Sequence, residues 1–309
     1  PTAFTASNPA MPAAGLVEEP KREILNGLEG MGEAIARWDF IAAKQTPEEK
    51  AGQVRQFARE QGLDLPLVLK PNKGQRGEGV LVAHAWEEVR DYCERTHDDL
   101  IVQEYIAGEE YGVFYYRMPG EARGHVSNIT IKTLPCVTGD GERDIEHLIL
   151  DGDETVVLAP YFLRKNAERM EDVPAKGETV VLGEAANHCR GADFRDGEHL
   201  LTPELEAAID RLAQAYDGFY FGRFDIRVPS EADFRAGRNL KVLELNGVTS
   251  EAVSAYDNRN SLWRGYKLMF RHWDLAFRIG KANLKARRAH AVSLLRLLSL
   301  WLEYRSRRY

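Results

Sequence analysis

Residues 219–228 read FYFGRFDIRV, and residues 240–246 read LKVLELN. Both runs are rich in aromatic and branched aliphatic residues, which favour β-strands. Asp225 lies within the first run, and Glu244 and Asn246 close the second. If the two strands are neighbours, these three side chains meet and form a cluster of hard oxygen donors, which suits Mg²⁺ together with nucleotide phosphates. Acids that face water at the ends of edge strands are the alternative, and this pair of runs alone favours neither.

A glycine-rich segment lies upstream. Residues 67–71 (LVLKP) form a short apolar run that ends in Lys70-Pro71, residues 72–80 hold three glycines, and residues 81–83 are apolar again. This pattern predicts a strand, a flexible loop and a second strand. Glycines let backbone N–H groups approach phosphate oxygens, and a lysine adds a point charge. The segment is neither a P-loop nor a dinucleotide fingerprint, because the lysine precedes the glycines and no G-x-G-x-x-G opens a helix. A plain hairpin with a solvated lysine is the alternative.

A third pattern follows after about one helix. Residues 100–106 (LIVQEYI) and residues 111–117 both read as strands, and residues 107–110 connect them. A strand that runs into a connector can offer backbone donors and acceptors to an adenine edge, and an acid just beyond it can hold ribose hydroxyls. A simple strand–turn–strand is the alternative.

In this order the segments resemble the ATP-grasp superfamily, and within it carboxylate–amine ligases such as D-alanine–D-alanine ligase, glutathione synthetase and cyanophycin synthetase. The resemblance covers residues 65–257. It rests on an ordered set of motifs: Lys70-Pro71 with its glycine loop, Gln103-Glu104-Tyr105-Ile106-x-Gly108-x-Glu110, Lys132, Arg223-x-Asp225 and Glu244-x-Asn246. It implies an α+β fold in which two subdomains clasp ATP between their sheets.

The resemblance also implies roles around the phosphates. Lys70 would contact the α- and β-phosphates, and Lys132 would be a second phosphate lysine. The loop would close over them as a lid, with contacts from four of its residues: Lys73, Gly74, Gly77 and Gly79.

For the adenosine, the resemblance assigns Gln103 to the adenine amino group. The backbone of Glu104 and Ile106 would complete the adenine contacts, and Glu110 would bind the ribose.

Asp225, Glu244 and Asn246 are implied as ligands of two Mg²⁺ or Mn²⁺ ions, with Glu244 bridging them. Arg223 resembles the arginine that steadies the acyl phosphate and the tetrahedral intermediate.

Residues 187–197 resemble the acceptor region of these ligases. They depart from its usual Asn-x-Ser-Thr-Gly-Gly motif, so the resemblance assigns a role in the acceptor pocket to Asn187 and Arg190 only.

The implied activity is that of an ATP- and Mg²⁺-dependent ligase, which activates a carboxylate as an acyl phosphate and joins it to an amine of an amino acid or other small molecule. Such transfer needs in-line placement and charge neutralisation, which explains the lysines, the arginine and the metal ligands. Two alternatives stay open: a phosphotransferase with a small-molecule acceptor, and a nucleotide-binding protein without turnover.

Composition bears on partners and compartment. The chain has 309 residues and a net charge of −7, which gives no general attraction to nucleic acid. Three cysteines (Cys93, Cys136 and Cys189) are an odd number and widely spaced, which argues against a disulfide framework. Residues 1–16 lack a signal-peptide pattern, and no run approaches the ~20 apolar residues of a membrane span. We therefore expect a cytoplasmic protein.

We expect four regions: an extended and helical N-terminal segment (1–64, with helices at 20–40 and 46–61), a small lid subdomain (65–105), a large subdomain (106–275) and a C-terminal helix region (276–309). Related ligases carry an additional α/β domain before the nucleotide region. The short segment here therefore indicates either a reduced member or a piece of a longer polypeptide.

The C-terminal helix is expected over residues 284–308. Its apolar arc is too wide for a lone solvated helix, which favours burial against the core, another domain or a second copy over contact with a membrane surface.

Overall fold

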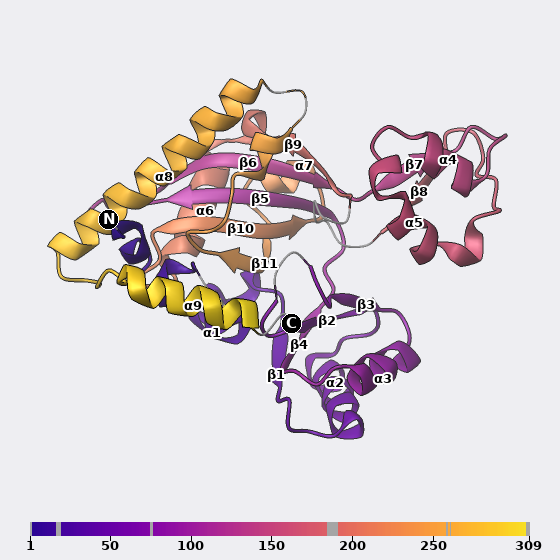
Figure 1. Ribbon diagram of the computed structural model, residues 1–309, viewed down its shortest axis with the longest axis horizontal. Coiled ribbons are helices and arrows are strands. Elements are labelled where there is room, and N and C mark those ends of the chain that lie inside the picture. The colour runs from indigo at the N-terminus through magenta and orange to yellow at the C-terminus, as the bar shows by residue number, and fades with distance from the viewer. Residues whose placement is uncertain are drawn as a thin grey trace. The chain divides into compact units, whose positions relative to one another are not determined.

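The computed structural model describes residues 2–16, 20–74, 77–183, 191–257, 259 and 261–306, and it has a mixed α+β structure with antiparallel sheets (Figure 1). The chain divides into two compact units. Unit 1 comprises residues 1–131 and 196–309, and unit 2 comprises residues 132–195. The residues of unit 2 all fall inside the region expected as the large subdomain.

The first sheet of unit 1 has four strands in the order β1-β4-β2-β3. Its strands are β1 (Trp38–Ile41), β2 (Leu67–Pro71), β3 (Leu81–Ala83) and β4 (Leu100–Glu104). The pairs β1–β4, β2–β4 and β2–β3 are antiparallel, so the expected strand–loop–strand around the glycines is present as β2 and β3.

Two helices accompany this sheet, α2 (Pro47–Gln61) and α3 (Trp86–Arg95). Helix α2 matches the expected 46–61 helix, and a capping box between Thr46 and Glu49 fixes its start. Apolar side chains from both helices and the sheet form one core: Ile41, Val54, Phe57, Leu67, Leu69, Val89 and Val102.

The second sheet has five strands in the order β11-β10-β5-β6-β9. They are β5 (Glu109–Tyr116), β6 (His125–Thr133), β9 (Asp193–Asp196), β10 (Phe221–Val228) and β11 (Lys241–Asn246). The chain leaves unit 1 along β6 and returns along β9. The runs 219–228 and 240–246 thus form neighbouring antiparallel strands, β10 and β11.

The two faces of the second sheet carry different layers. One face packs on α6 (Pro203–Gln214) and α7 (Glu231–Arg235), and that core includes Tyr111, Val113, Ile209, Phe224, Ile226 and Phe234. The other face is covered at one end by α8 (Leu262–Lys285), whose Leu275, Ala276 and Ile279 share a core with Phe114 and Phe221. Alternate residues of β10 therefore serve opposite layers.

The 3₁₀ turn η1 (Ala3–Ala6) lies against α8. At Gly280 the helix backbone approaches the carbonyl of Ala3 so closely that a Cβ would collide with it. Asn283 fixes the same contact, because its Nδ2 donates to the Ala6 carbonyl at 2.9 Å.

The expected helix over residues 20–40 is wrong in its second half. Helix α1 (Lys21–Gly27) is short, the 3₁₀ segment η3 (Glu29–Ala34) follows, and the chain then enters β1. Glycines at 27, 30 and 32 weaken a continuing helix, while the pairing of Trp38–Ile41 with β4 stabilises a strand.

The expected single helix over residues 284–308 is also wrong. Helix α8 ends at Lys285, Arg287 adopts a left-handed conformation with φ of 54°, and a new helix, α9 (Leu294–Ser306), begins after an irregular stretch. A left-handed residue just past a helix end stops the helix. Among the described residues no helix combines the length and the apolar character needed to cross a membrane.

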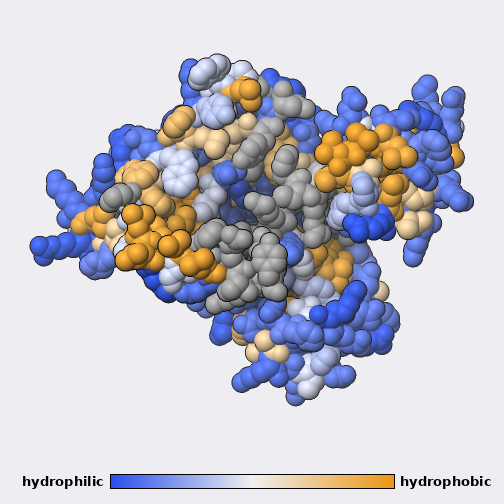
Figure 2. All heavy atoms as spheres, in the orientation of Figure 1, coloured by the Kyte–Doolittle hydropathy of each residue, from blue (hydrophilic) through white to orange (hydrophobic). Residues whose placement is uncertain are grey.

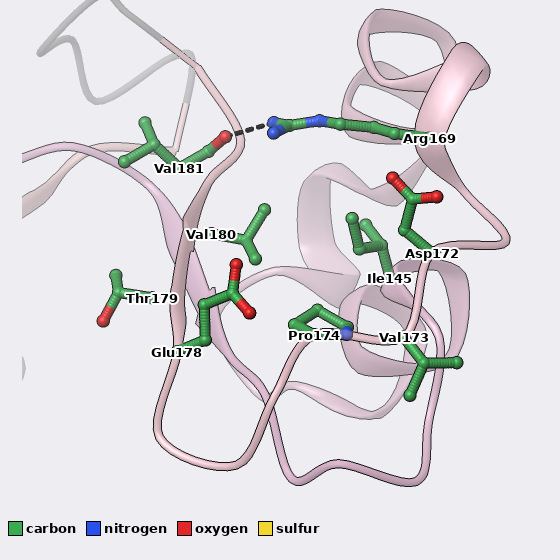
Figure 3. Close-up of a pocket in the computed structure, with 9 residues that line it drawn as sticks. All are labelled: Ile145, Arg169, Asp172, Val173, Pro174, Glu178, Thr179, Val180 and Val181. Carbon is green, nitrogen blue, oxygen red and sulfur yellow. Dashed lines mark hydrogen bonds between the residues drawn. The ribbon is translucent and has the colours of Figure 1, made fainter.

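Unit 2 contains a two-stranded sheet, β7 (Cys136–Thr138) and β8 (Thr179–Val181), with helices α4 (Ile145–Asp151) and α5 (Ala159–Lys165). A cavity of about 290 Å³ opens in this unit (Figure 3), where Ile145 and Val180 face one another. Arg169 lies at its edge and donates to the Val181 carbonyl. None of the predicted site residues is among the described residues that line this cavity.

Candidate active site

The predicted metal ligands lie together on β10 and β11. The strand register sets Asp225 opposite Glu244 and Arg223 opposite Asn246, and residues opposite one another in an antiparallel pair point to the same face. Asn246 Nδ2 is 3.2 Å from Asp225 Oδ2, and Arg223 Nε donates to Asp225 Oδ1 at 2.8 Å. Asp225 is buried, whereas the side chain of Glu244 is 37% exposed. The structure therefore brings these three residues to one face of the paired strands β10 and β11.

Neighbouring carboxylates keep the Arg223 guanidinium protonated. Burial alone would lower the pKa of the Arg223 guanidinium, but Asp225, and then Glu244 and Glu110, raise it overall. A fixed cation therefore lies beside the carboxylates at every accessible pH.

A bulge in β11 links the two sheets of unit 1. The register pairs Asp225 with Glu244 and the next residue, Ile226, with Val242, so Leu243 is an extra residue. The Leu243 carbonyl accepts from Gln103 Nε2 of β4 at 3.2 Å and from Lys70 Nζ of β2 at 3.4 Å. Because of this bulge, the first sheet reaches the strand that carries Glu244.

Lys70 is a buried cation beside these carboxylates. Its Nζ donates to Gln103 Oε1 at 2.8 Å. Burial is the main cause that lowers the pKa of Lys70 to about 8; the negative charge of Glu244 opposes this shift, and the positive charge of Lys21 adds to it. At neutral pH the side chain stays mostly protonated, so it offers a poorly solvated positive charge to an anionic ligand.

Gln103 uses both ends of its amide within the protein. Its oxygen accepts from Lys70, and its nitrogen donates to Leu243. Adenine contact by the Gln103 side chain, as the resemblance implies, would compete with these two bonds. In this structure Gln103 positions Lys70.

Lys21 is a site residue that sequence reasoning missed. It is the first residue of α1, it is buried, and its Nζ donates to the Gly74 carbonyl at 2.9 Å and lies 3.7 Å from Glu244 Oε1. The same end of α1 holds the start of the glycine loop, since Arg22 N donates to Asn72 Oδ1 at 2.9 Å. A lone lysine in a short helix, far from the loop in sequence, belongs to no motif, so no sequence signal marked it.

The predicted ribose acid is part of a buried ion pair. Glu110 Oε2 accepts from Arg227 Nε at 3.0 Å, and both side chains are nearly buried. The register of β5 and β10 places these two residues opposite one another. Arg227 also donates to the Ile106 carbonyl at 2.7 Å, so it holds both the predicted ribose acid and the predicted adenine connector. Sequence reasoning missed Arg227 as well.

Glu104 has a different partner. Its carboxylate forms a bidentate ion pair with Arg37. Arg37 Nε donates to Glu104 Oε2 at 3.0 Å, and Arg37 NH2 donates to Glu104 Oε1 at 2.6 Å. The backbone reinforces it, because Glu104 N donates to the Arg37 carbonyl at 2.8 Å. The Glu104 side chain thus holds β4 against the segment before β1. The role predicted for Glu104 in adenine binding uses its backbone and does not require this side chain.

The glycine loop is described at both ends but not at Gln75 and Arg76. Lys73 and Gly74 follow β2, and Gly77 and Gly79 precede β3 with positive φ of 70° and 71°. A Cβ at position 79 would lie 2.7 Å from Pro71 Cγ, so close approach as well as conformation requires glycine there. Tyr92 OH donates to the Gly79 carbonyl at 2.5 Å.

Three predicted residues fall outside the described part of unit 1. Lys132 is a buried residue at the start of unit 2, so it is described with that unit and not with this site. Asn187 and Arg190 lie outside the described residues, and their predicted acceptor role stays a prediction.

The donor set suits a hard cation. Two carboxylates and an amide offer only oxygen atoms, which Mg²⁺ and Mn²⁺ prefer. Within the described ranges no group of three His, Cys, Asp or Glu side chains is placed to hold a metal ion, so the amide of Asn246 is needed to complete a set of three. The residues present therefore fit magnesium better than zinc.

Unit 1 also contains a polar hollow of about 360 Å³ beside the first turns of α8. Ser127 and Asn128 of β6 line it from the sheet, and Arg264, Lys267 and Arg271 line it from the helix. Arg264 is neutralised by Asp196, at 2.5 Å, and by Glu198, at 3.1 Å.

Comparison with known proteins finds similarity over part of the chain. Residues 34–113, from just before β1 into β5, match the family model of the RimK-like ATP-grasp domain. The D-alanine–D-alanine ligase of Pediococcus pentosaceus is 29% identical over 100 residues, which are 31% of this chain and 26% of that protein. The chain thus spans about a quarter of the length of this curated relative.

Two solved structures are similar at low identity. One is a D-alanine–D-alanine ligase from Bacillus anthracis (TM-score 0.46, 14% identity, 87% of this chain and 68% of that one). The other is a bifunctional glutathione synthetase from Pasteurella multocida (TM-score 0.42, 17% identity, 80% of this chain and 35% of that one). Over residues 34–113 this chain is therefore similar to the RimK-like ATP-grasp domain, and over 100 residues it is distantly similar in sequence to a D-alanine–D-alanine ligase.

Proposed function

We propose that this chain is an ATP- and Mg²⁺-dependent ligase, which activates a carboxylate as an acyl phosphate and joins it to an amine. One observation carries the proposal: the Leu243 bulge brings the buried cation Lys70 next to the strand that carries Glu244 and Asn246, opposite Asp225. In this proposal, a site for the triphosphate and a site for its metal would be built from two sheets at one place.

The residues match the needs of phosphoryl transfer. The γ-phosphoryl group moves from ATP to a carboxylate oxygen, and ADP leaves. The amine nitrogen then attacks the acyl carbon and expels phosphate. Both steps need positioning and neutralised charge rather than a nucleophilic side chain. Lys70 and Lys21 would face the nucleotide phosphates, and Arg223 would stabilise the acyl phosphate and the tetrahedral intermediate.

The metal ligands have a separate part in the proposal. Asp225, Glu244 and Asn246 would hold Mg²⁺ or Mn²⁺, and a bound ion would neutralise charge on the triphosphate. Arg223 already contacts Asp225, so the guanidinium would orient that carboxylate.

The loop at residues 73–79 would exclude water from the acyl phosphate, which hydrolyses readily. Its described ends support this assignment. Lys21 fastens the Gly74 carbonyl at one end, and Tyr92 fastens the Gly79 carbonyl at the other.

The adenosine would lie where β4 runs into β5. Glu110 is oriented there by Arg227, which also binds the Ile106 carbonyl. In this proposal the ribose hydroxyls contact Glu110, and adenine contacts the backbone between Glu104 and Ile106.

The experiment is a screen for ADP release with ATP, Mg²⁺ and a panel of carboxylates and amines, tested singly and in pairs. A ligase needs both substrates, whereas a phosphotransferase releases ADP with one hydroxyl acceptor. Once a carboxylate is found, it is supplied with oxygen-18 in its carboxyl group. The proposal predicts transfer of label into inorganic phosphate, and phosphate without label would contradict an acyl phosphate.

A further inference from the structure

Helix α8 has a second apolar face that the rest of the described chain covers only in part, since Trp273 packs edge-on against Phe4. Six large apolar side chains line it: Leu262, Trp263, Tyr266, Met269, Phe270 and Trp273. At 100° per residue they occupy an arc of about 120° along three turns. Four of them are more than half exposed, at 83% for Leu262, 76% for Trp263, 73% for Phe270 and 55% for Tyr266. The core of the protein lies against another side of the same helix, through Leu275 and Ile279.

Helix α9 repeats the pattern. Leu294, Leu295, Leu298 and Leu302 recur at the spacing of one helix face, and all four are exposed, Leu295 by 82%. Among the described residues, this face of α9 is therefore not buried against the rest of the chain. Figure 2 shows hydrophobic side chains gathered over α9, on the face of unit 1 on which α8 is also seen in Figure 1.

The same region carries a charge opposite to that of the rest of the chain. Residues 261–309 contain twelve Lys and Arg against two acids, Asp274 and Glu303. The chain as a whole has 41 basic and 48 acidic residues, so residues 1–260 contain 29 and 46. On α8 the exposed basic residues follow one row along the helix, which includes Lys267, Arg278 and Lys285 and borders the apolar stripe.

We propose that α8 and α9 form a lipid-binding surface, which lies in the headgroup region of an anionic bilayer. A helix with a Trp, Phe and Leu stripe beside a basic row is the type that binds such interfaces, where aromatic rings enter the headgroup layer and lysines contact anionic lipid. A monomer seldom exposes an apolar patch of this size without a partner for it. The inference is independent of the proposed ligase activity.

Two other partners fit the observations less well. Nucleic acid would attract the basic row, but it offers nothing to cover ten exposed apolar side chains on two helices. A second copy of the chain would cover the apolar stripes, but it would bring like charges together if the same surfaces met. An anionic lipid surface would cover the apolar stripe and attract the basic row at the same time.

The test is flotation of the purified chain with vesicles of phosphatidylcholine alone or with about 30% phosphatidylglycerol. We expect binding to the anionic vesicles, little binding to the neutral ones, and loss of binding at high salt, which screens surface charge. The variant with Trp263→Ser and Phe270→Ser removes apolar contact, and the variant with Lys281→Glu and Lys285→Glu reverses charge. Each should lower the bound fraction roughly tenfold or more.

Matched controls separate this surface from general effects. Val157→Ser with Val173→Ser removes exposed apolar side chains in unit 2, and Arg59→Glu with Arg90→Glu makes the same charge change on α2 and α3. Both controls should bind vesicles as the unchanged chain does. The proposal is overturned if the unchanged chain does not float with anionic vesicles. It is also overturned if the stripe variant alters only the mass in solution, or if the charge variant alters only the binding of a DNA or RNA duplex.

Discussion

The Nζ of Lys21 lies 3.7 Å from Oε1 of Glu244, so the first residue of α1 meets the middle of β11. The same amine donates to the Gly74 carbonyl in the glycine loop. One side chain from the N-terminal segment therefore contacts both the predicted phosphate loop and a predicted metal ligand. The N-terminal segment is part of the site and not only a lead-in to it.

Replacement of Lys21 tests this relationship. We expect Lys21→Ala to raise the apparent KM for ATP roughly three- to tenfold, because a charge close to the phosphates is lost and the loop end is released. The readout is ADP release against ATP concentration. Arg22→Ala, at the exposed neighbouring position, is the control and should change KM little. Equal effects of the two substitutions would remove Lys21 from the site.

Removal of one metal ligand tests the oxygen cluster. Glu244→Gln keeps the shape of the side chain but loses its charge, so turnover should fall by at least about a hundredfold, with a higher Mg²⁺ requirement. Melting temperature should change little, because this side chain is partly exposed. Glu231→Gln on α7 is the matched control. Full activity at ordinary Mg²⁺ concentration in the Glu244 variant would contradict the metal assignment.

The lowered pKa of Lys70 predicts a pH dependence of nucleotide binding. Above a pKa of about 8 the free site loses its buried charge, so kcat/KM for ATP should fall as the pH rises through that value. Lys70→Arg stays charged at these pH values, and its profile should lack the fall near pH 8. Identical profiles for the two proteins would show that Lys70 does not face the phosphates.

The lowered pKa of Lys70 also predicts that the free energy of unfolding rises with pH, whereas kcat/KM for ATP falls. The folded-state pKa of Lys70 lies below its unfolded value of 10.5, so the folded state binds fewer protons between these two values. The contribution of Lys70 to the free energy of unfolding therefore rises as the pH increases from about 8 toward 10. The unfolding free energy of the unchanged chain minus that of Lys70→Met, measured in urea across this range, should increase with pH. A constant difference would contradict the buried, charged state.

The ion pair between Arg227 and Glu110 predicts a coupled loss of stability. Arg227→Met leaves a nearly buried carboxylate without its partner, which should destabilise the fold by about 3 kcal/mol. Addition of Glu110→Gln should recover part of that loss, because the orphaned charge is gone. Urea unfolding of the two single variants and the double variant gives the coupling energy. Simple additivity would show that the two side chains do not depend on one another.

The strands of the site could be predicted from sequence because their residues are locally consistent. Aromatic and branched residues in 219–228 and 240–246 favour strands wherever they occur, and Lys70 and the glycines lie between two short apolar runs. The juxtaposition of Asp225, Glu244 and Asn246 then follows from the pairing of β10 with β11.

The contacts made by single side chains could not be predicted in this way. Lys21, Arg37 and Arg227 act through partners far away in the chain, and a single basic residue carries no pattern of its own. The Leu243 bulge is likewise invisible in an alternating strand sequence. The two helix errors have local causes: glycines after α1, and a left-handed Arg287 after α8.

The most direct measurement is a crystal structure of this chain with Mg²⁺ and a non-hydrolysable ATP analogue. The account predicts metal ions at about 2.1 Å from carboxylate oxygens of Asp225 and Glu244, with Lys70 against the phosphates. Nucleotide bound elsewhere, or metal ions bound without these two carboxylates, would contradict it.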